Sequence, residues 1–175
     1  HGKTYGAVSL GHIRSHVYGA VRAPGSHMVP RPDSYRPIWM KPDGTIDTDQ
    51  YLAFYDQYLD KATVGAVAGF VLEPIQGWGG AIMPPDDFFP KLRKFCDARK
   101  LLLMADEVLT SWGRTGKWLC LEHWGVVPDV VTIGKGFGPV EVEHPHNQVG
   151  AHLGHLFSQR RAQQGQHRLG GFLTF

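Results

Sequence analysis

The stretch LLLMADEV, residues 101–108, is an apolar run that ends abruptly in two carboxylates. Such a run is typical of a strand that is buried on both faces of a sheet. A similar run, residues 64–74, precedes it and ends at Glu73, and a third, residues 129–136, follows it and ends at Lys135. We therefore predict three neighbouring strands whose ends carry charged side chains.

The segments between these runs predict connectors on the flanks of the sheet. Residues 86–100 place Phe88, Leu92 and Cys96 at helical spacing, and residues 113–128 predict a turn with a short helix. Strands that alternate with such connectors are typical of an α/β fold with a parallel sheet. We therefore expect an α/β fold with a parallel-rich sheet and flanking helices.

The remaining segments are less regular. Residues 43–62 predict a helix that Asp47 or Thr48 caps, because aromatic and aliphatic residues recur there at helical spacing. The segment GAVSL, residues 6–10, predicts a short strand, and the rest of the first forty residues predicts a long loop with turns. The tail, residues 139–175, shows no strong period, so we do not expect it to continue the buried sheet.

Composition narrows the class of protein. A chain of 175 residues can bury one sizeable core. A net charge of +2 without a lysine/arginine block argues against nucleic acid or a membrane surface as a partner, and no apolar run approaches a membrane span. The first ten residues lack the pattern of a signal peptide. We expect a cytoplasmic protein.

The candidate metal ligands are sparse. Cys96 and Cys120 lie among apolar residues without metal-ligand spacing, so we expect buried free thiols in a reducing compartment. Four histidines of the tail are irregularly spaced and have no cysteine near them, which favours a solvated tail over a metal site. They are His144, His146, His152 and His155. We predict no metal site.

The charged strand ends are the candidate chemistry. In open α/β sheets, ligands bind outside the carboxyl ends of the strands. A lysine at a strand end can be desolvated and become a nucleophile toward carbonyls, and Gly134 and Gly136 leave room for a flat partner beside Lys135. A pyridoxal phosphate Schiff base fits this arrangement, with Lys135 on the aldehyde and Asp106 on the pyridine nitrogen. Freed from the aldehyde, Lys135 would serve as general base and acid.

Each of these residues also has a plain structural interpretation. A strand-end lysine is commonly solvated, and an Asp-Glu pair commonly caps the next turn or helix. Glu73 precedes Pro74 and has the position of a loop ion-pair partner. From the local pattern alone, these interpretations outweigh a catalytic role.

A family resemblance changes that balance. The segments EPIQGWGG (73–80), LLLMADEV, GRTGK (113–117) and PDVVTIGKGFG (128–138) together closely resemble the class III, ω-type, pyridoxal-phosphate-dependent aminotransferases of fold type I. HGKTYGAVSL at the start and VPRPDSYR (29–36) resemble the same family. The likeness covers residues 1–138, which we interpret as a partial cofactor-binding large domain. The tail from residue 139 to residue 175 does not resemble the family and stays unassigned.

The resemblance implies roles for individual residues. Lys135 would form the Schiff base, Asp106 would pair with the pyridine nitrogen, and Val108 would pack on the ring face of the cofactor. Glu73 would hold the local network of the active site. The pair His1-Gly2 resembles the motif that follows the family's ring-stacking aromatic residue, which implies a place beside the cofactor.

Two positions depart from the family pattern. Many members that act on ω-amino acids have a glutamate where Trp78 stands, so Trp78 implies a different, less polar substrate pocket. Many members have a glutamine, which contacts the phenolic oxygen of the cofactor, where this chain has Leu109.

The resemblance also implies an activity. We expect transfer of an amino group from an amine or amino acid to a 2-oxo acid by a homodimer. A racemase or epimerase, or a decarboxylase, on the same scaffold is the alternative within enzymes, because all share the Schiff base. A non-catalytic fragment of the scaffold is the alternative outside them.

Overall fold

The computed structural model describes residues 1–2, 4–11, 22–135 and 171–174. Five strands form one sheet in the order β1-β5-β2-β3-β4, and every neighbouring pair is parallel. The strands are β1 (Ser26–Met28), β2 (Val67–Leu72), β3 (Leu102–Asp106), β4 (Val130–Thr132) and β5 (Gly171–Thr174). The helices are α1 (Tyr5–Leu10), α3 (Thr48–Ala62), α4 (Phe88–Arg99) and the 3₁₀-helix η1 (Cys120–Trp124).

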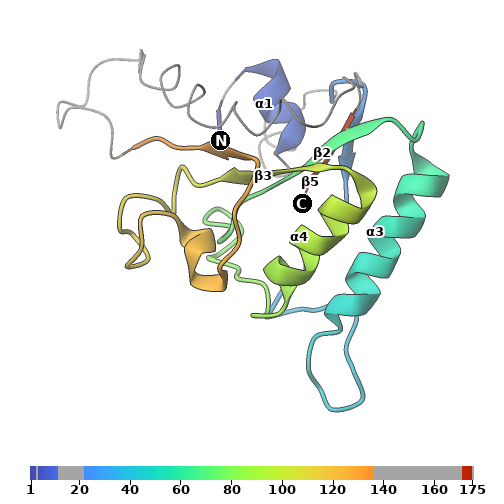
Figure 1. The fold of residues 1–175 in the computed structure, drawn as a ribbon, viewed down its shortest axis with the longest axis horizontal. Helices are drawn as coiled ribbons and strands as arrows, with labels where there is room; N and C mark the ends of the chain where they lie inside the picture. The colour runs from blue at the N-terminus through green and yellow to red at the C-terminus, as the bar shows by residue number, and fades with distance from the viewer. Residues whose placement is uncertain (3, 12–21, 136–170, 175) are drawn as a thin grey trace.

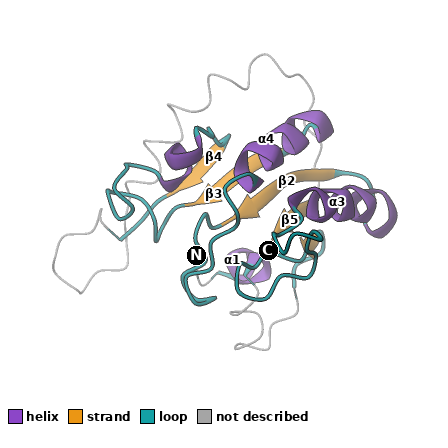
Figure 2. Ribbon diagram, turned by 90° about the horizontal axis from the view of Figure 1, so that it is seen from below, coloured by secondary structure: helices purple, strands orange, loops and turns teal. Residues whose placement is uncertain are grey.

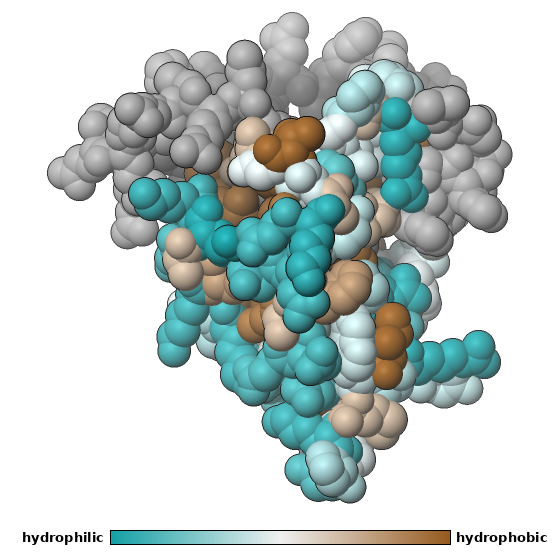
Figure 3. Space-filling view, turned by 90° about the vertical axis from the view of Figure 1, so that its right-hand side faces the viewer, coloured by the Kyte–Doolittle hydropathy of each residue, from teal (hydrophilic) through white to brown (hydrophobic). Residues whose placement is uncertain are grey.

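Two helices cover one face of the sheet. Helices α3 and α4 lie on that face, and α1 lies on the opposite side (Figures 1 and 2). The core between the two helices and the sheet is built from aromatic and aliphatic side chains: Tyr51, Tyr55, Leu59, Phe70, Leu72, Phe88, Phe89, Leu92, Leu103, Ala105 and Leu173. The outward face of α3 is polar, as Figure 3 shows. The fold is therefore layered, as expected for an α/β domain.

Helix α3 forms where the sequence predicted it. Asp47 is its N-cap, and the Asp47 side chain accepts a hydrogen bond from the backbone N–H of Gln50 at 3.0 Å. Tyr51, Tyr55 and Leu59 recur every four residues and point into the core. The Tyr55 hydroxyl also donates a hydrogen bond to the carbonyl of Pro30 at 2.6 Å, so the buried phenol is satisfied.

Helix α4 leads directly into β3. Lys100 ends the helix in the left-handed region, with φ of +57°, and its N–H bonds back to Asp97. Arg93 on α4 forms an ion pair with Asp129 at 2.7 Å, and the same carboxylate accepts the N–H of Leu103 at 2.8 Å. One carboxylate thus ties the helix to β3 at the start of β4.

Most predicted elements are confirmed: β2, β3, the helix after β2 and the short helix after β3 all form, and the sheet is parallel. Strand β4 ends at Thr132, so Lys135 lies three residues beyond the strand and not on its last residue. No helix among the described residues is long and apolar enough to cross a membrane.

The predicted strand at residues 6–10 is wrong. These residues lie in helix α1, whose N-cap Thr4 accepts a hydrogen bond from the N–H of Ala7 at 3.3 Å. The Ser9 hydroxyl donates to the carbonyl of Tyr5 at 2.7 Å and accepts the N–H of Ala23 at 2.8 Å. These capping and side-chain bonds stabilise a helical turn that a five-residue apolar pattern does not reveal.

Two strands lie where none was expected. Strand β1 occurs within the predicted loop of the first forty residues, and β5 occurs within the tail. Residues 171–174 thus continue the buried sheet, contrary to the prediction for this part of the tail. Each strand is only three or four residues long, too short for an alternating pattern to be recognised.

Candidate active site

The carboxyl ends of β2, β3 and β4 meet at one edge of the sheet. In the register of the strands, Leu72 lies opposite Ala105, and Asp106 lies opposite Thr132. Glu73, the residue after Leu72, is therefore level with Asp106. Lys135 follows β4 at the same edge. The topology thus brings together the three charged groups that the sequence singled out.

The pKa of Glu73 reflects this grouping. Burial raises it, and the negative charge of Asp106 raises it further. The N–H of Gly77, the N-terminal ammonium and the charge of Lys135 act in the opposite direction. The Glu73 carboxylate accepts the N–H of Gly77 at 3.4 Å. Glu73, Asp106 and Lys135 therefore lie within electrostatic range of one another.

Asp106 is a nearly buried carboxylate with donors on one side. Its residue is 8% exposed, and Oδ1 accepts the N–H of Val108 at 3.1 Å. His1 supplies the other donors: Nδ1 lies 3.0 Å from Oδ1, and the α-ammonium forms an ion pair with Oδ2. Because a carboxylate only accepts, the imidazole donates from Nδ1. The sequence predictions for His1 and Asp106 therefore fall on residues that are in contact.

Lys135 lies at this edge of the sheet, three residues after the end of β4. Its φ is +56°, in the left-handed region, and its side chain is exposed. The sequence analysis had allowed for a desolvated amine at this position. The described residues leave the Lys135 side chain exposed, so they do not desolvate its amine. A Cβ added to Gly134 would lie 3.3 Å from Val108 Cγ1. The glycine before the lysine thus lets Val108 approach the backbone closely.

The neighbouring loops are packed through Leu109. A Cβ on Gly77 would lie 2.2 Å from Leu109 Cδ2, so Leu109 covers this glycine and joins the loops after β2 and β3. Trp78, next in the same loop, is 70% exposed. Gly2 has φ of +123°, and a Cβ there would meet Ala7 at 2.7 Å. Gly2 is therefore required by the turn into α1.

Glu107 caps the next helix, η1, as the plain structural interpretation of the Asp-Glu pair allowed. It is fully buried and accepts the N–H groups of Cys120 at 2.9 Å and Leu121 at 3.0 Å. The hydroxyl of Thr110 donates to the same carboxylate. Side chains alternate along a strand, so consecutive residues point to opposite faces. This alternation was the signal in the sequence that Asp106 and Glu107 lie on opposite faces of the sheet and have different partners.

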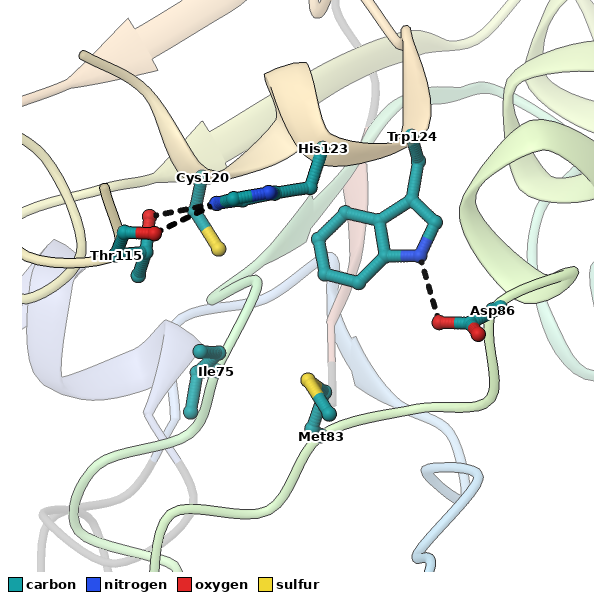
Figure 4. Close-up of a pocket in the computed structure, with 7 residues that line it drawn as sticks. All are labelled: Ile75, Met83, Asp86, Thr115, Cys120, His123 and Trp124. Atoms are coloured by element: carbon teal, nitrogen blue, oxygen red, sulfur yellow. Dashed lines mark hydrogen bonds between the residues drawn. The ribbon is translucent and has the colours of Figure 1, made fainter. Parts of the chain in front are cut away.

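A cavity of about 530 Å³ has a lining that includes none of Glu73, Asp106 and Lys135 (Figure 4). In it, His123 Nε2 donates to the Thr115 carbonyl at 2.9 Å, and Trp124 Nε1 donates to Asp86 at 3.2 Å. Burial, and then the charge of Glu107, raises the pKa of the Cys120 thiol to about 11. The thiol is therefore protonated at neutral pH and is no nucleophile. The lining residues are Ile75, Met83, Asp86, Thr115, Cys120, His123 and Trp124.

The part of the chain that the structure describes contains no cluster of side chains that could bind a metal ion. There, no group of three or more His, Cys, Asp or Glu side chains is arranged to hold a metal ion. The tail histidines lie outside the described residues.

Comparison with known proteins identifies the family. Residues 1–140 match the family model described as aminotransferase class-III. This chain belongs to the class III aminotransferase family. The class III chain is 35% identical over 139 residues to a leucine/methionine racemase of Thermococcus litoralis, and 36% identical over 141 residues to a putrescine–pyruvate aminotransferase of Pseudomonas aeruginosa. These alignments cover 79% and 78% of this chain but 31% and 30% of the relatives. The class III chain thus spans less than a third of their length.

A solved structure shows the same fold. An amine transaminase from an uncultivated Pseudomonas species, in its pyridoxal-phosphate-bound form, is 36% identical with a TM-score of 0.61. The alignment covers 76% of this chain and 30% of that one. The chain therefore has the fold of part of a pyridoxal-phosphate transaminase, and the cofactor of the class III family is pyridoxal phosphate.

The residues at the sheet edge fit that cofactor chemically. A nearly buried carboxylate, an exposed amine and an aliphatic side chain against a glycine lie at one edge: Asp106, Lys135 and Val108. They offer a hydrogen-bond acceptor, an amine and an apolar surface, and a flat, cationic ring with an aldehyde can use all three.

Proposed function

We propose that this edge of the sheet is part of the active site of an aminotransferase, which moves an amino group from an amine or amino acid to a 2-oxo acid. The observation that carries the proposal is the grouping of Asp106, Glu73 and Lys135 at the carboxyl ends of three parallel strands. Ligands bind at this edge in open α/β sheets. The family membership supports the same reaction class.

Lys135 is proposed as the catalytic residue. When bound, pyridoxal phosphate supplies an aldehyde for amines and a ring that withdraws electrons from the substrate carbon. Lys135 Nζ would hold the aldehyde before substrate arrives and would then carry a proton between substrate atoms. Its exposed position after β4 leaves the amine accessible to small molecules.

Asp106 is proposed to hold the proton of the ring nitrogen. A carboxylate beside that nitrogen stabilises the protonated ring. His1 and the N–H of Val108 fix the orientation of the carboxylate by donating to Oδ1. Val108 would supply the apolar surface against the ring, since it lies against Gly134, the residue before the lysine.

Three further residues are proposed to shape the site. Glu73, whose pKa is raised by burial and by Asp106, would hold the local network through Gly77. Trp78 would form a wall of the substrate pocket, because it follows Gly77 on the loop after β2 and is largely exposed. Gly2, in the turn after His1, would help to place His1 beside the cofactor.

Racemisation is the second candidate. The 35% identity to a leucine/methionine racemase favours it, because the same lysine and carboxylate chemistry can return a proton to either face of the substrate carbon. Net amino transfer to the oxo acid distinguishes the two reactions.

Product assays with matched lysine variants test the proposal. The chain, pyridoxal phosphate, putrescine and pyruvate are incubated, and alanine is measured; leucine followed by chiral chromatography tests racemisation. We expect alanine from the wild type and from Lys100→Arg, and none from Lys135→Arg. Lys100 is a suitable control because it is also exposed, with φ of +57°, at the opposite end of the neighbouring strand. Equal turnover by both variants would overturn the role of Lys135, and inverted leucine without alanine would replace transamination by racemisation.

We also propose that the protein works as a homodimer in the cytoplasm. Support for the compartment comes from two free thiols, Cys96 and Cys120, both buried. Light scattering measures the mass of the protein in solution. A mass of 19.5 kDa, which is that of one chain, at all concentrations would contradict the homodimer.

A further inference from the structure

The loop after β2 that carries Trp78 has a closed base. Residues 76–82, called the Trp78 loop below, begin and end in an antiparallel bridge between Gln76 and Ile82, with N–H···O distances of 2.9 and 3.2 Å. Within the loop, Ala81 has φ of +57°, in the left-handed region that a residue with a Cβ rarely adopts. Such a backbone conformation persists only where neighbouring groups hold it. The contacts at the base of the loop therefore decide where the Trp78 side chain lies.

Arg31 contacts that base from the loop after β1. Its Nη1 donates to Oε1 of Gln76 at 3.0 Å, and Gln76 is buried, with 8% of the residue exposed. Asp33 fixes the guanidinium from another side, because it accepts from Nε at 3.3 Å and from Nη2 at 3.1 Å. A Cβ added to Gly79 would lie 3.3 Å from both Arg31 Nη1 and Gln76 Oε1. The hydrogen bond between Arg31 and Gln76 therefore lies against the backbone of the residue that follows Trp78.

The Trp78 loop is also joined to the charged edge of the sheet. The N–H of Gly77 donates to Glu73 at 3.4 Å, and Leu109, from the loop after β3, covers Gly77. Strands β1, β5, β2 and β3 are parallel, so the loops that follow β1, β2 and β3 leave the sheet at one edge. Gln76 precedes Gly77 in the chain, so Arg31 acts on the loop directly beside the residue that contacts Glu73.

We propose that Arg31 is a positioning residue for the amino donor, because it holds the Trp78 loop in the conformation in which the indole forms a wall of the donor pocket. This inference rests on the proposed aminotransferase function. A wall that is already in place loses little conformational freedom when the donor binds, which lowers the KM for the donor. The chemical step is assigned to Lys135 and Asp106, so the loss of Arg31 should raise KM and leave kcat nearly unchanged.

A double-mutant cycle tests whether Arg31 acts through Trp78. Arg31→Met, Trp78→Ala and the double variant of the full chain are assayed with pyridoxal phosphate, pyruvate and putrescine. We expect Arg31→Met to raise the KM for putrescine by about tenfold, with kcat within about twofold of the wild type. In the Trp78→Ala background, the same substitution should have no further effect on KM.

Arg36→Met is the matched control for this cycle. Arg36 lies in the same loop as Arg31, is exposed, and places its guanidinium over the ring of Tyr35. Its replacement removes the same charge, and we expect no change in KM. An equal rise in KM with and without the Trp78 side chain, a fall in kcat alone, or the same rise in Arg36→Met would overturn the positioning role.

Hydrogen exchange of the Trp78 loop gives a readout that does not depend on turnover. The N–H groups of Gln76 and Ile82 exchange when the base of the loop opens, and mass spectrometry follows the peptides that contain them. We expect exchange about five- to tenfold faster in Arg31→Met, the loss of roughly one hydrogen bond, and unchanged exchange in α4. Arg31→Lys keeps the charge without the planar fork, so it should show smaller effects of the same kind and replaces Arg31→Met if that variant does not fold.

The two measurements separate two kinds of failure. Unchanged exchange in the Trp78 loop of the Arg31 variants would overturn the proposal that Arg31 holds the loop. Absence of alanine from the wild type would contradict the proposed function itself, and with it the role in donor binding, whatever the exchange shows. Faster exchange together with a KM effect that requires Trp78 is the result that the proposal predicts.

Discussion

Two consecutive carboxylates at the end of β3 lie in different regions of the molecule. Glu107 points into the face that η1 covers, where two backbone N–H groups and a hydroxyl satisfy it completely inside the chain. Asp106 points to the opposite face, toward His1 and the edge where Lys135 lies. Both carboxylates are buried, and the groups that bind Glu107 come from the loop after β3 and from η1.

The difference separates a charge that the fold satisfies internally from one that we propose to be functional. A buried charge persists only when it is paired and hydrogen-bonded. Glu107 meets that requirement through the start of η1, where unpaired N–H groups favour a negative charge. Asp106 meets it through the N–H of Val108 and through His1, on the opposite face of the sheet. Stability should therefore depend on Glu107, and cofactor chemistry on Asp106.

The largest expected effect is on stability. Glu107→Ala leaves the N–H groups of Cys120 and Leu121 buried without an acceptor, so we expect the free energy of unfolding to fall by about 2–5 kcal/mol. Urea denaturation followed by circular dichroism measures it. A loss below about 1 kcal/mol would show that water or another group replaces the carboxylate, and the structural role would fail.

Asp106→Asn should show the opposite profile. The amide oxygen can still accept the N–H of Val108, so we expect a stability loss of no more than about 1–2 kcal/mol. Amino transfer should fall by about 10²–10³-fold, because the charge that stabilises the protonated ring is gone. Asp86→Asn, an exposed carboxylate beside the cavity of Figure 4, is the control. Unchanged turnover in Asp106→Asn would remove Asp106 from the site.

Part of this division was predictable from the sequence. The apolar runs correctly predicted β2 and β3, and their charged ends, Glu73 and Asp106-Glu107, correctly predicted a shared edge of the sheet. The cap at Asp47 correctly predicted helix α3. The helix at residues 6–10 was missed because its cap, Thr4, lies outside the apolar pattern. Strand β5 was missed because its pairing is entirely non-local: four residues find their partners about a hundred positions upstream.

The division between Asp106 and Glu107 also required the structure. The alternation of a strand assigns them to opposite faces, but only the position of η1 shows which face supplies donors. The contact of His1 with Asp106 joins residues 105 positions apart, which no local pattern contains.

A smaller effect should appear on the Cys120 thiol. Its pKa is raised to about 11, first by burial and then by the charge of Glu107. In Glu107→Gln, checked for folding by circular dichroism, we expect the pKa to fall but to stay above its ordinary value, because the burial remains. Alkylation by iodoacetamide at increasing pH, read by mass spectrometry, measures it.

Cys96 is the internal control for that experiment. Burial raises the pKa of its thiol to about 12, and the charges that act on it are those of Arg93, Asp129 and Asp97. Its alkylation profile should not move in Glu107→Gln. A shift of both thiols together would indicate general loosening of the core, and no shift of either would contradict the influence of Glu107 on Cys120.

The smallest effect concerns the pH dependence of stability at the opposite face. The folded pKa of Glu73 is raised above 4.5, so the folded state holds this proton more tightly than the unfolded state. The stability contribution of Glu73 is therefore lost as the pH rises above 4.5 through the folded pKa. Glu73→Gln cannot lose a proton, so its stability relative to the wild type should increase over that range.

Urea denaturation at several pH values between 4 and 7 measures this difference. Glu122→Gln, an exposed carboxylate on η1, corrects for the general loss of a negative charge. After this correction, the stability difference between Glu73→Gln and the wild type should change with pH. A difference that is constant across the range would show that burial and Asp106 do not raise the pKa of Glu73.

The most direct test of the site is chemical labelling of its lysine. The chain is incubated with pyridoxal phosphate and reduced with borohydride, and its peptides are mapped by mass spectrometry. The site described above predicts a pyridoxyl mass on the peptide that contains Lys135, with Lys100 and the other exposed lysines unlabelled. Label distributed over the surface lysines, or no label on Lys135, would contradict a cofactor site at the carboxyl edge of the sheet.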